Sequence, residues 1–469
     1  MFLAFSFYIE KSFPMCYTEK NTLIGKDFFM SIHLKDLMEN DGAICPSCGK
    51  RHFGLLRDYI AEENAIAKLP ALLEKYGCKR PFVLCDPNTY RAAGKRVEAV
   101  LKAAGVAFSL HIMASEKPAP DERTVGEALM YCEAACDSVI AVGGGVLNDT
   151  CKIIAAAKNV PDIIVATAPS MDGFASASSS MERSGLKISL NSKCPDAVIA
   201  DPEILIRAPK RMILSGIGDI LAKYVSIVEW KIAHILVGDF YCETVAAIVQ
   251  DSLAQCVRDA KAAVNGDKKA ILSVMEALVI SGLAMNYAGI SRPASGMEHY
   301  ISHIVDMRAL EWGTASDFHG IQCAVATLTT VRAYERLFKT APDREKALAA
   351  VSAYDNEVWN AYLREKLGHG AESIIAGEVK ERKYDREKHA VRLEKIISEW
   401  NALADIVKTL PKSEDLEAFM KEIGHPTEPC ELGLTDEQWD EAFLMAKDIR
   451  DKYVLGRLLW DLGEESMNF

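Results

Sequence analysis

The stretch SVIAVGGGVLNDTCKIIAAA, residues 138–157, decides the fold class of this chain. An apolar run over Ser138–Val142 leads into three glycines at 143–145, and a helical pattern covers Asn148–Ala157. Without Cβ atoms, main-chain N–H groups can approach a pyrophosphate, and the positive end of the following helix points at the phosphates. The spacing differs from G-x-G-x-x-G, so a plain tight turn is the alternative. Polar residues on the first turn, among them Asp149, favour a dinucleotide site.

Strands and helices alternate on both sides of this stretch. Strands are expected at Pro81–Cys85, Ala107–Ile112, Ser138–Val142 and Ile163–Thr167, and helices at Ala61–Tyr76, Tyr90–Ala104, Thr124–Ala135 and Asn148–Ala157. Strands separated by helices of this length predict a parallel, Rossmann-like sheet with helices on both faces. We place this α/β dinucleotide-binding domain at residues 55–208, after an N-terminal extension at 1–54.

The second half of the chain has a different pattern. Two short β-like runs flank residues 183–185 and a third covers Ala197–Ala200, but from Pro209 onward the strand signal disappears. Long helical patterns follow at Gly218–Val237, Tyr241–Val264, Lys269–Met285 and Glu298–Leu310. We expect an all-α domain at 209–369 and a helical C-terminal extension at 370–469. A cleft between the α/β half and the helical half is the expected place for a site.

The composition is typical of a globular protein with reduced cysteines. The formal net charge of −12 argues against a nucleic-acid surface, which needs clustered Lys and Arg. The 13 cysteines are odd in number and scattered, so we expect reduced thiols in a cytoplasmic protein. Residues 1–9 are mostly apolar, but Glu10 and Lys11 follow without a basic leader or cleavage site. We therefore expect neither a signal peptide nor a membrane span.

Three separate elements carry residues that suit a catalytic divalent metal. Asp219 follows Gly216-Ile217-Gly218 at an expected helix start, where the alternative role is an N-cap worth about 1 kcal/mol. His299 and His303 are four residues apart and share one helix face. His319 opens another helical pattern. One carboxylate and two imidazoles leave an open coordination position and suit Zn²⁺, Ni²⁺ or Fe²⁺.

Other candidate residues have open alternatives. Asp86 ends an expected strand, where it either accepts hydrogen bonds from an adenosine ribose or caps a helix. The hydroxyls of residues 167–176 either meet a pyrophosphate and nicotinamide or belong to a plain Ser/Gly loop. Cys45-Pro46-Ser47-Cys48, with His52 nearby, is half of a zinc knuckle; no second C-x-x-C lies close in sequence, so a reduced turn is the alternative.

Five motifs together resemble one superfamily. They are VGGG at 142–145 with Asp149 and Lys152, SMDG at 170–173, GIGD at 216–219, SRPASGMEH at 291–299 and FHG at 318–320. The set resembles dehydroquinate synthases, glycerol dehydrogenases and iron-type alcohol dehydrogenases, which implies a dehydroquinate synthase-like fold. The SRPASGMEH run looks like that of bacterial sn-glycerol-1-phosphate dehydrogenases. Glycerol dehydrogenases tend to have AHxxHN there, and dehydroquinate synthases GHTxGH. The resemblance covers residues 61–340 well, and the helical tail resembles the bacterial branch.

The resemblance implies a role for each matching residue. The metal ligands would be Asp219, His299 and His319. Asp172 would lie beside the substrate hydroxyls, and His303 near the proton path. The dinucleotide would be lined by Gly144, Gly145 and Asp149, together with Gly143 of the same run, and Thr167, Ser170 and Ser176 would help. Arg292 would contact a substrate phosphate, with Lys187 as a second candidate; a surface ion pair is the alternative for each.

The expected activity follows from these roles. The resemblance implies NAD(P)H-dependent interconversion of dihydroxyacetone phosphate and sn-glycerol 1-phosphate with one divalent metal, Zn²⁺ or Ni²⁺ before Fe²⁺, in a homodimer. A glycerol dehydrogenase acting on an unphosphorylated polyol is the nearest alternative. A lyase that uses NAD catalytically, like dehydroquinate synthase, and a non-catalytic sensor of metal and nucleotide are further alternatives.

Overall fold

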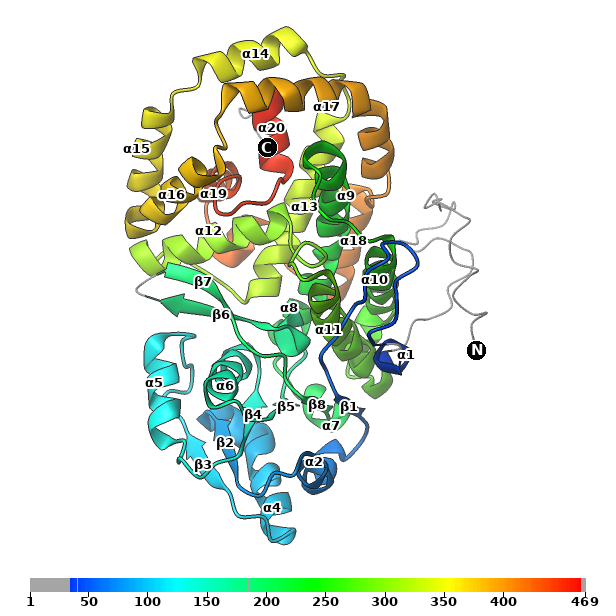
Figure 1. Ribbon diagram of the computed structural model, residues 1–469, viewed down its shortest axis with the longest axis vertical. Coiled ribbons are helices and arrows are strands. Elements are labelled where there is room, and N and C mark those ends of the chain that lie inside the picture. The colour runs from blue at the N-terminus through cyan, green and yellow to red at the C-terminus, as the bar shows by residue number, and fades with distance from the viewer. Residues whose placement is uncertain (1–33, 40, 184–185, 465–469) are drawn as a thin grey trace.

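A parallel sheet forms the first half of the molecule, as the sequence predicts, and it has six strands (Figure 1). The computed structural model describes residues 34–39, 41–183 and 186–464. The strand order is β1-β8-β5-β4-β2-β3. The strands are β1 (Asp58–Ala61), β2 (Pro81–Cys85), β3 (Ser109–Ile112), β4 (Ser138–Gly143), β5 (Asp162–Ala166) and β8 (Ala197–Ala200). A separate antiparallel hairpin pairs β6 (Ser178–Arg183) with β7 (Leu186–Asn191).

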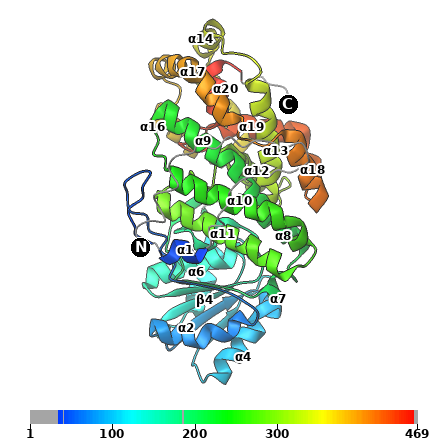
Figure 2. The same cartoon turned by 90° about the vertical axis from the view of Figure 1, so that its right-hand side faces the viewer.

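Alternate residues of the central strands enter two different cores. Val83, Ile140 and Val165 pack with helices α2 (Leu69–Tyr76) and α4 (Lys95–Ala103) on one face. Leu84, Ala141 and Ile164 belong to the larger core on the other face, with α6 (Gly145–Lys158). Both faces are therefore covered, which explains the uninterrupted apolar runs of β2, β4 and β5. Figure 2 shows α6 on one side of the sheet and α2 on the other.

The helix expected at Ala61–Tyr76 was wrong in its first part. Residues 58–61 form the edge strand β1, which pairs in parallel with β8. A 3₁₀ turn at Ala65–Lys68 follows, and α2 starts only at Leu69. The four residues of β1 are all half-buried, so no apolar run marks the strand in the sequence. The remaining helices around the sheet are α1 (Leu34–Glu39), α3 (Pro87–Thr89), α5 (Glu122–Tyr131) and α7 (Pro202–Leu205), with a π-helical turn at Tyr90–Gly94.

The second half is helical, also as predicted. Its central helices are α8 (Lys210–Leu221), α9 (Lys223–Val237), α10 (Glu243–Val264), α11 (Lys268–Ala288), α12 (Met297–Trp312) and α13 (His319–Leu337). The C-terminal helices are α14 (Arg344–Ala353), α15 (Asn356–Leu367), α16 (Ala371–Glu381), α17 (Arg386–Val407), α18 (Ser413–Ile423), α19 (Asp436–Ala446) and α20 (Leu455–Leu462). One hydrophobic core joins both groups to the sheet, and the domain limits at 55, 209 and 370 stay predictions.

The Gly-Ile-Gly-Asp motif does not open a helix, contrary to our expectation. Asp219 lies in the last turn of α8, which begins nine residues earlier at Lys210. The glycines instead allow close packing: a Cβ on Gly216 would lie 1.9 Å from the carbonyl oxygen of Pro169, and one on Gly320 1.8 Å from that of Ser215. α8 and α13 therefore touch backbone to backbone, which brings Asp219 to the start of α13.

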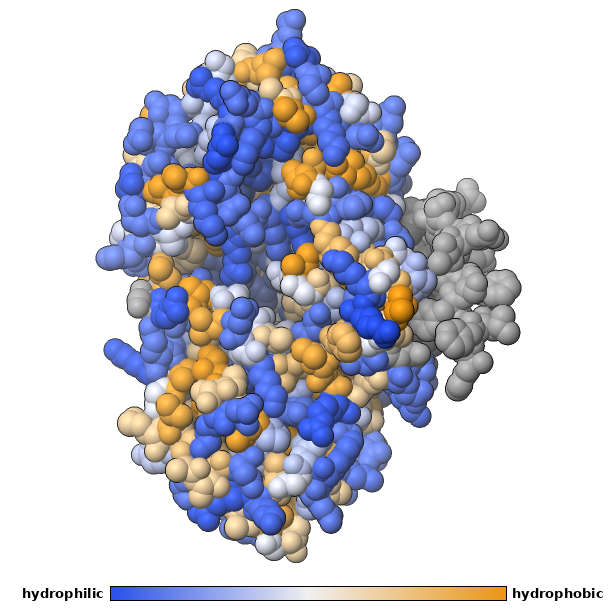
Figure 3. Space-filling view, viewed as in Figure 1, coloured by the Kyte–Doolittle hydropathy of each residue, from blue (hydrophilic) through white to orange (hydrophobic). Residues whose placement is uncertain are grey.

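Helix α11 is the one helix in the described ranges that is long and apolar enough to cross a membrane. In the structure 67% of its most apolar window is buried. It packs against α10 and α8 and against the turn at residues 172–175, so core packing accounts for its hydropathy. Figure 3 shows the surface hollowed between the two halves, with hydrophilic residues along the recess.

Candidate active site

Four potential metal ligands from three helices converge between the two halves. Asp219 from α8, His299 from the first turn of α12, and His319 and Cys323 from the first turns of α13 each offer one atom within 4.8 Å of the others. The sequence analysis proposed the first three of these residues as ligands, and the structure brings them together. It missed Cys323, although its position one helical turn after His319 places it on the same face.

Hydrogen bonds at the Nδ1 atoms orient the imidazoles of both His299 and His319. His299 Nδ1 lies 2.8 Å from Glu298 Oε1, and its Nε2 lies 3.4 Å from Asp219 Oδ1. The Nδ1 atom of His319 lies 3.1 Å from the hydroxyl of Ser302. A metal-binding histidine is usually held in this way, with one ring nitrogen fixed by a carboxylate or other polar group. These hydrogen bonds fix both rings within the cluster of potential ligands.

The donor set fits a divalent transition metal. One carboxylate oxygen and two imidazole nitrogens suit Zn²⁺, Ni²⁺ or Fe²⁺, with the Cys323 sulfur as a further donor for a softer ion. Burial tends to raise the pKa of Asp219, but the Lys223 ammonium and the two imidazoles hold it well below its usual range. Asp219 therefore offers the anionic oxygen that such an ion requires.

Asp172 and Lys223 form the neighbouring wall of the site. The Nζ atom of Lys223 donates to Asp172 Oδ2 at 2.7 Å and to the carbonyl of Ala294 at 2.9 Å, and lies 3.4 Å from Asp219 Oδ1. The main-chain N–H of Asp172 donates to Asp219 Oδ2 at 2.8 Å. Burial disfavours the ammonium, but Asp172 and then Asp219 raise the pKa of Lys223 above its usual value. Lys223, which was not predicted as a site residue, thus neutralises two buried carboxylates.

His303 lies one turn after His299 on α12. Its ring stacks at 5.7 Å on that of His319, and its buried Nδ1 has no hydrogen-bond partner among the described residues. Burial, followed by the positive charges of Arg450 and Lys187, holds the pKa of His303 well below its ordinary value. His303 is therefore a neutral imidazole at the edge of the metal cluster.

The two cations expected at a substrate phosphate have protein partners. Lys187 pairs with Asp306. Arg292 is buried, where it pairs with Asp239 and donates from Nη1 to the carbonyl of Tyr453 at 2.8 Å. Arg292 thus has the ion pair that was the alternative for it, although the pair is buried rather than on the surface. The phosphate role of both residues stays a prediction.

A loop of the C-terminal part closes over this region. Arg450 Nη1 donates to the Ser189 hydroxyl of β7 at 3.2 Å. Lys452 Nζ donates to the carbonyl of Ser295 at 2.7 Å, and burial followed by Arg292 lowers the pKa of Lys452 to about 7. Arg450 and Lys452 were not predicted as site residues, because the sequence of a charged helical tail does not show where the tail packs.

The residues expected at the dinucleotide gather at the carboxyl ends of β4 and β5. Gly144 precedes α6, and a Cβ there would lie 3.4 Å from Ser170 Oγ. The N–H of Thr167 donates to the carbonyl of Gly143 at 3.2 Å. A Cβ on Gly145 would lie 3.5 Å from Cγ of Met171, at the end of the same loop. Ligands of open parallel sheets bind at this edge, so the arrangement suits a dinucleotide.

Three other expected cofactor residues are engaged within the protein. Asp86 caps α3 by accepting from the N–H of Thr89 at 2.8 Å, which was its alternative role. Asp149 accepts from the N–H of Ser180 at 2.9 Å and pairs with Lys152 at 3.0 Å. Ser176 Oγ donates to the carbonyl of Ser178 at 3.0 Å. Their cofactor roles stay predictions.

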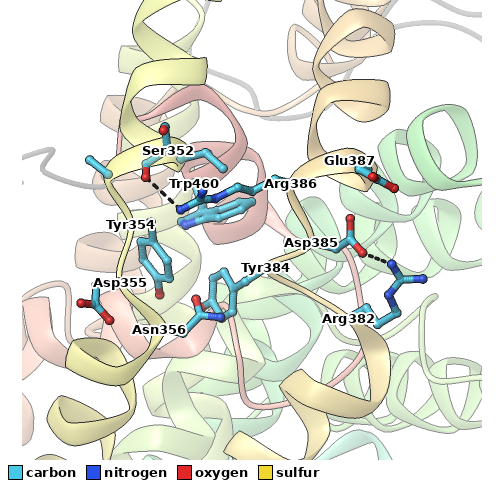
Figure 4. A pocket seen from close by; sticks show the side chains of 12 residues that line it. Ser352, Tyr354, Asp355, Asn356, Arg382, Tyr384, Asp385, Arg386, Glu387 and Trp460 are labelled. Carbon is cyan, nitrogen blue, oxygen red and sulfur yellow. Dashed lines mark hydrogen bonds and ion pairs between the residues drawn. The ribbon is translucent and has the colours of Figure 1, made fainter.

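A separate hollow of about 830 Å³ lies among the C-terminal helices, between the end of α14 and the start of α17 (Figure 4). Arg386 there donates to the carbonyl of Ser352 at 2.9 Å, and Arg382 pairs with Asp385. Its cations are thus engaged within the protein, and we assign it no function.

A parallel sheet with a glycine loop at its carboxyl edge, facing a cluster of potential metal ligands on helices, is the arrangement of a class of metal-dependent oxidoreductases. The model of that class, described as iron-containing alcohol dehydrogenase, matches residues 60–209. The glycerol dehydrogenase of Schizosaccharomyces pombe has a similar fold, with a TM-score of 0.58 at 18% identity over 87% of this chain and 89% of the other. An alcohol dehydrogenase from Oenococcus oeni gives 0.56 at 16% identity, over 88% and 98% of the two chains.

Relatives with higher sequence identity identify the family within this class. A glycerol-1-phosphate dehydrogenase (NAD(P)+) of Bacillus velezensis is 36% identical over 64% of this chain and 78% of its own length. One of Halalkalibacterium halodurans is 30% identical over 87% and 93% of the two chains. One of Pyrococcus furiosus is 34% identical over 58% and 77%. This chain belongs to the glycerol-1-phosphate dehydrogenase family, within the iron-containing alcohol dehydrogenase class.

Proposed function

We propose that this chain reduces dihydroxyacetone phosphate to sn-glycerol 1-phosphate with NADH or NADPH, and catalyses the reverse reaction. The convergence of Asp219, His299 and His319 on one point carries the proposal. Each imidazole is held from behind, and the cluster lies beside the loop at residues 172–175, which follows the coenzyme edge of the sheet. A metal site next to a dinucleotide site suits metal-assisted hydride transfer to a carbonyl.

The bound groups supply the reactive chemistry, and the protein positions them. A divalent cation held by Asp219, His299 and His319 would act as a Lewis acid that stabilises negative charge on the substrate oxygen. NAD(P)H, held by the loops at 143–145 and 167–170, would supply the hydride. Asp172 is fixed by Lys223 and by the Ser281 hydroxyl at 2.9 Å, so its carboxylate can orient a substrate hydroxyl without moving.

His303 suits a proton relay in this scheme. A neutral imidazole donates at one ring nitrogen and accepts at the other. Its low pKa keeps it neutral at physiological pH, and its Nδ1 has no partner among the described residues. We propose that His303 passes a proton between the substrate oxygen and solvent.

Cations near His303 suit the phosphate. Arg450 donates to the hydroxyl of Ser189 on β7, two residues from Lys187, and Lys187 pairs with Asp306, which lies three residues after His303 on α12. A guanidinium can bind a phosphate through two parallel hydrogen bonds, so we propose Arg450 as the main phosphate contact, with Lys187 beside it. Arg292 is held by Asp239 and the Tyr453 carbonyl, so we propose that it supports the loop that carries Lys452.

A substrate panel tests the function. NADH or NADPH oxidation should be faster with dihydroxyacetone phosphate than with dihydroxyacetone, should stop with chelator and should return with metal. The His319→Ala variant should lose one bound metal and turnover together. Faster turnover of the unphosphorylated ketone would instead support a glycerol dehydrogenase, whose fold this chain shares. Full activity of metal-free His319→Ala would refute the metal-dependent scheme.

We also propose that the enzyme is a homodimer of the cytoplasm. The proposal rests on the resemblance to its family and on the many cysteines, of which twelve are free thiols in the described residues. Light scattering on a size-exclusion column should give twice the mass of one chain; a monomer mass at micromolar concentration would contradict it.

A further inference from the structure

A second cluster of metal-binding side chains lies away from the active site. Cys45 and Cys48, from the N-terminal segment, and His52 meet Cys242, which is the residue immediately before α10. One atom from each residue lies within 4.8 Å of the others. The sequence offered only half of a zinc knuckle, and the fold supplies the missing ligand from 190 residues further along.

The distances within the cluster suit a tetrahedral zinc ion. The Cys45 and Cys242 sulfurs are 3.5 Å apart, and His52 Nε2 lies 3.3 Å from the Cys48 sulfur and 3.5 Å from the Cys242 sulfur. Zn–S bonds of about 2.3 Å and Zn–N bonds of about 2.0 Å at tetrahedral angles place ligand atoms about 3.5–3.8 Å apart. The distances between these side chains are thus close to those that a zinc ion imposes.

The backbone and the surrounding polar groups are also those of a zinc site. The N–H of Gly49 donates to the carbonyl of Cys45 at 2.9 Å, and Gly49 has φ +70°, so the turn after Cys48 needs glycine. His52 Nδ1 lies 2.7 Å from the carbonyl of Tyr287, which leaves Nε2 free to face the sulfurs. The Ser47 hydroxyl lies 3.3 Å from the sulfurs of both Cys45 and Cys242.

We propose that Cys45, Cys48, His52 and Cys242 bind a structural zinc ion, distinct from the catalytic metal. Three cysteines and one histidine close the coordination shell, so the ion has no open position for a substrate. Its effect is to fasten residues 41–54 to helices α10 and α11. This inference does not depend on the proposed activity.

Hydrogen bonds connect the proposed zinc site to the active-site turn at residues 172–175. Directly after the knuckle, the carbonyl of Gly54 accepts from Nδ2 of Asn286 at 2.7 Å. The same amide donates to the carbonyl of Ala175 at 2.8 Å and accepts from the N–H of Ala177 at 3.0 Å. Asn286 therefore joins the zinc-bound segment to the turn that carries Asp172. Zinc would hold that turn in place from outside.

Metal counting on the full-length protein tests the site. Protein purified in reductant and loaded with zinc should contain two equivalents per chain by mass spectrometry. Cys242→Ser and Cys48→Ala should each lose one equivalent, and His319→Ala should lose the other. Cys430→Ser is the matched control, because Cys430 is exposed and outside the cluster, and it should retain both. In cobalt-loaded His319→Ala, intense thiolate-to-cobalt bands should remain, and they should vanish in the double variant with Cys242→Ser.

Two further measurements keep the test decisive if a variant folds poorly. Cys48→His preserves four zinc donors, so it should retain two equivalents where Cys48→Ala retains one. The melting temperature should fall for Cys48→Ala and recover in Cys48→His. A wild-type protein with one equivalent, lost wholly in His319→Ala, would overturn the proposal. A disulfide between Cys45 and Cys48 or Cys242 in protein kept in reductant would overturn it equally.

Discussion

Replacing Glu298 by Gln should weaken metal binding without weakening the fold. Glu298 is fully buried, and its Oε1 atom accepts from His299 Nδ1 at 2.8 Å and from the N–H of Gly296 at 2.6 Å. A glutamine carbonyl can keep both hydrogen bonds, but it lacks the negative charge that makes the imidazole a stronger ligand. Loss of such an outer partner typically costs about 10–100-fold in metal affinity, or about 1.4–2.8 kcal/mol.

The fold should tolerate this change because of a second carboxylate. A Cβ on Gly296 would lie 2.8 Å from Glu298 Oε2 and 2.4 Å from Glu229 Oε2, so the two acids face each other. Burial, followed by the charge of Glu298, raises the pKa of Glu229 to about 8. The glutamine removes that repulsion, and its amide N–H₂ can donate to Glu229. The metal-free variant should therefore melt no lower than the metal-free wild type.

Glu229→Gln is the matched control. Glu229 accepts from the N–H groups of Met297 at 2.8 Å and Leu455 at 2.7 Å, and among the described residues it makes no hydrogen bond with His299 or His319. Competition with a chromophoric chelator should give a weaker metal affinity for Glu298→Gln and an unchanged one for Glu229→Gln. At saturating metal, Glu298→Gln should regain most of its turnover. Wild-type metal affinity in Glu298→Gln would refute the orienting role.

Two further predictions concern pH and substrate binding. Burial raises the pKa of Asp162 to about 8 from its ordinary 3.8, so the folded chain binds a proton that the unfolded chain releases. Wild-type stability relative to Asp162→Asn should fall by up to about 1.4 kcal/mol per pH unit between about pH 4 and pH 8. Urea unfolding that gives the same difference in free energy of unfolding between the two proteins at pH 5.5 and at pH 7.5 would contradict this. Arg450→Met should raise KM for dihydroxyacetone phosphate about 10–100-fold, as loss of a charge-assisted hydrogen bond predicts, and leave KM for dihydroxyacetone unchanged. Equal increases for both ketones would exclude phosphate binding by Arg450.

Local signals in the sequence were sufficient for the sheet and for most helices. The apolar runs of β2, β4 and β5 and the glycines after β4 lie next to each other in the chain, so their meaning does not depend on distant contacts. The prediction missed strand β1 because its four residues are half-buried at the sheet edge and do not form an apolar run. The prediction for the motif at 216–219 was wrong for the opposite reason. Gly216 and Gly218 pack against the carbonyls of Pro169 and Gly320, which only the folded chain brings near.

Two further residues of the site could have been predicted from the sequence. Each proposed metal ligand is followed four residues later by a side chain that reaches the same site: Lys223 after Asp219, His303 after His299, and Cys323 after His319. On a helix this spacing returns a side chain to the same face, and the i, i+4 proximity of Asp219 and Lys223 survives the break between α8 and α9. Of the three, only His303 was identified, because histidine alone already suggested chemistry. Once the ligands were chosen, helical geometry was enough to predict the other two.

No such rule reaches Cys242 or Arg450. Each comes from an element remote in sequence from its neighbours in the site, one before α10 and the other in the loop before α20, and each residue type has many copies in the chain. Their positions depend on how α10 packs against α11 and how the C-terminal helices return to α12. A site that needs ligands from several directions therefore takes some of them from distant parts of the chain. An incomplete metal-binding motif such as Cys45-x-x-Cys48 indicates that further ligands should be sought elsewhere in the sequence.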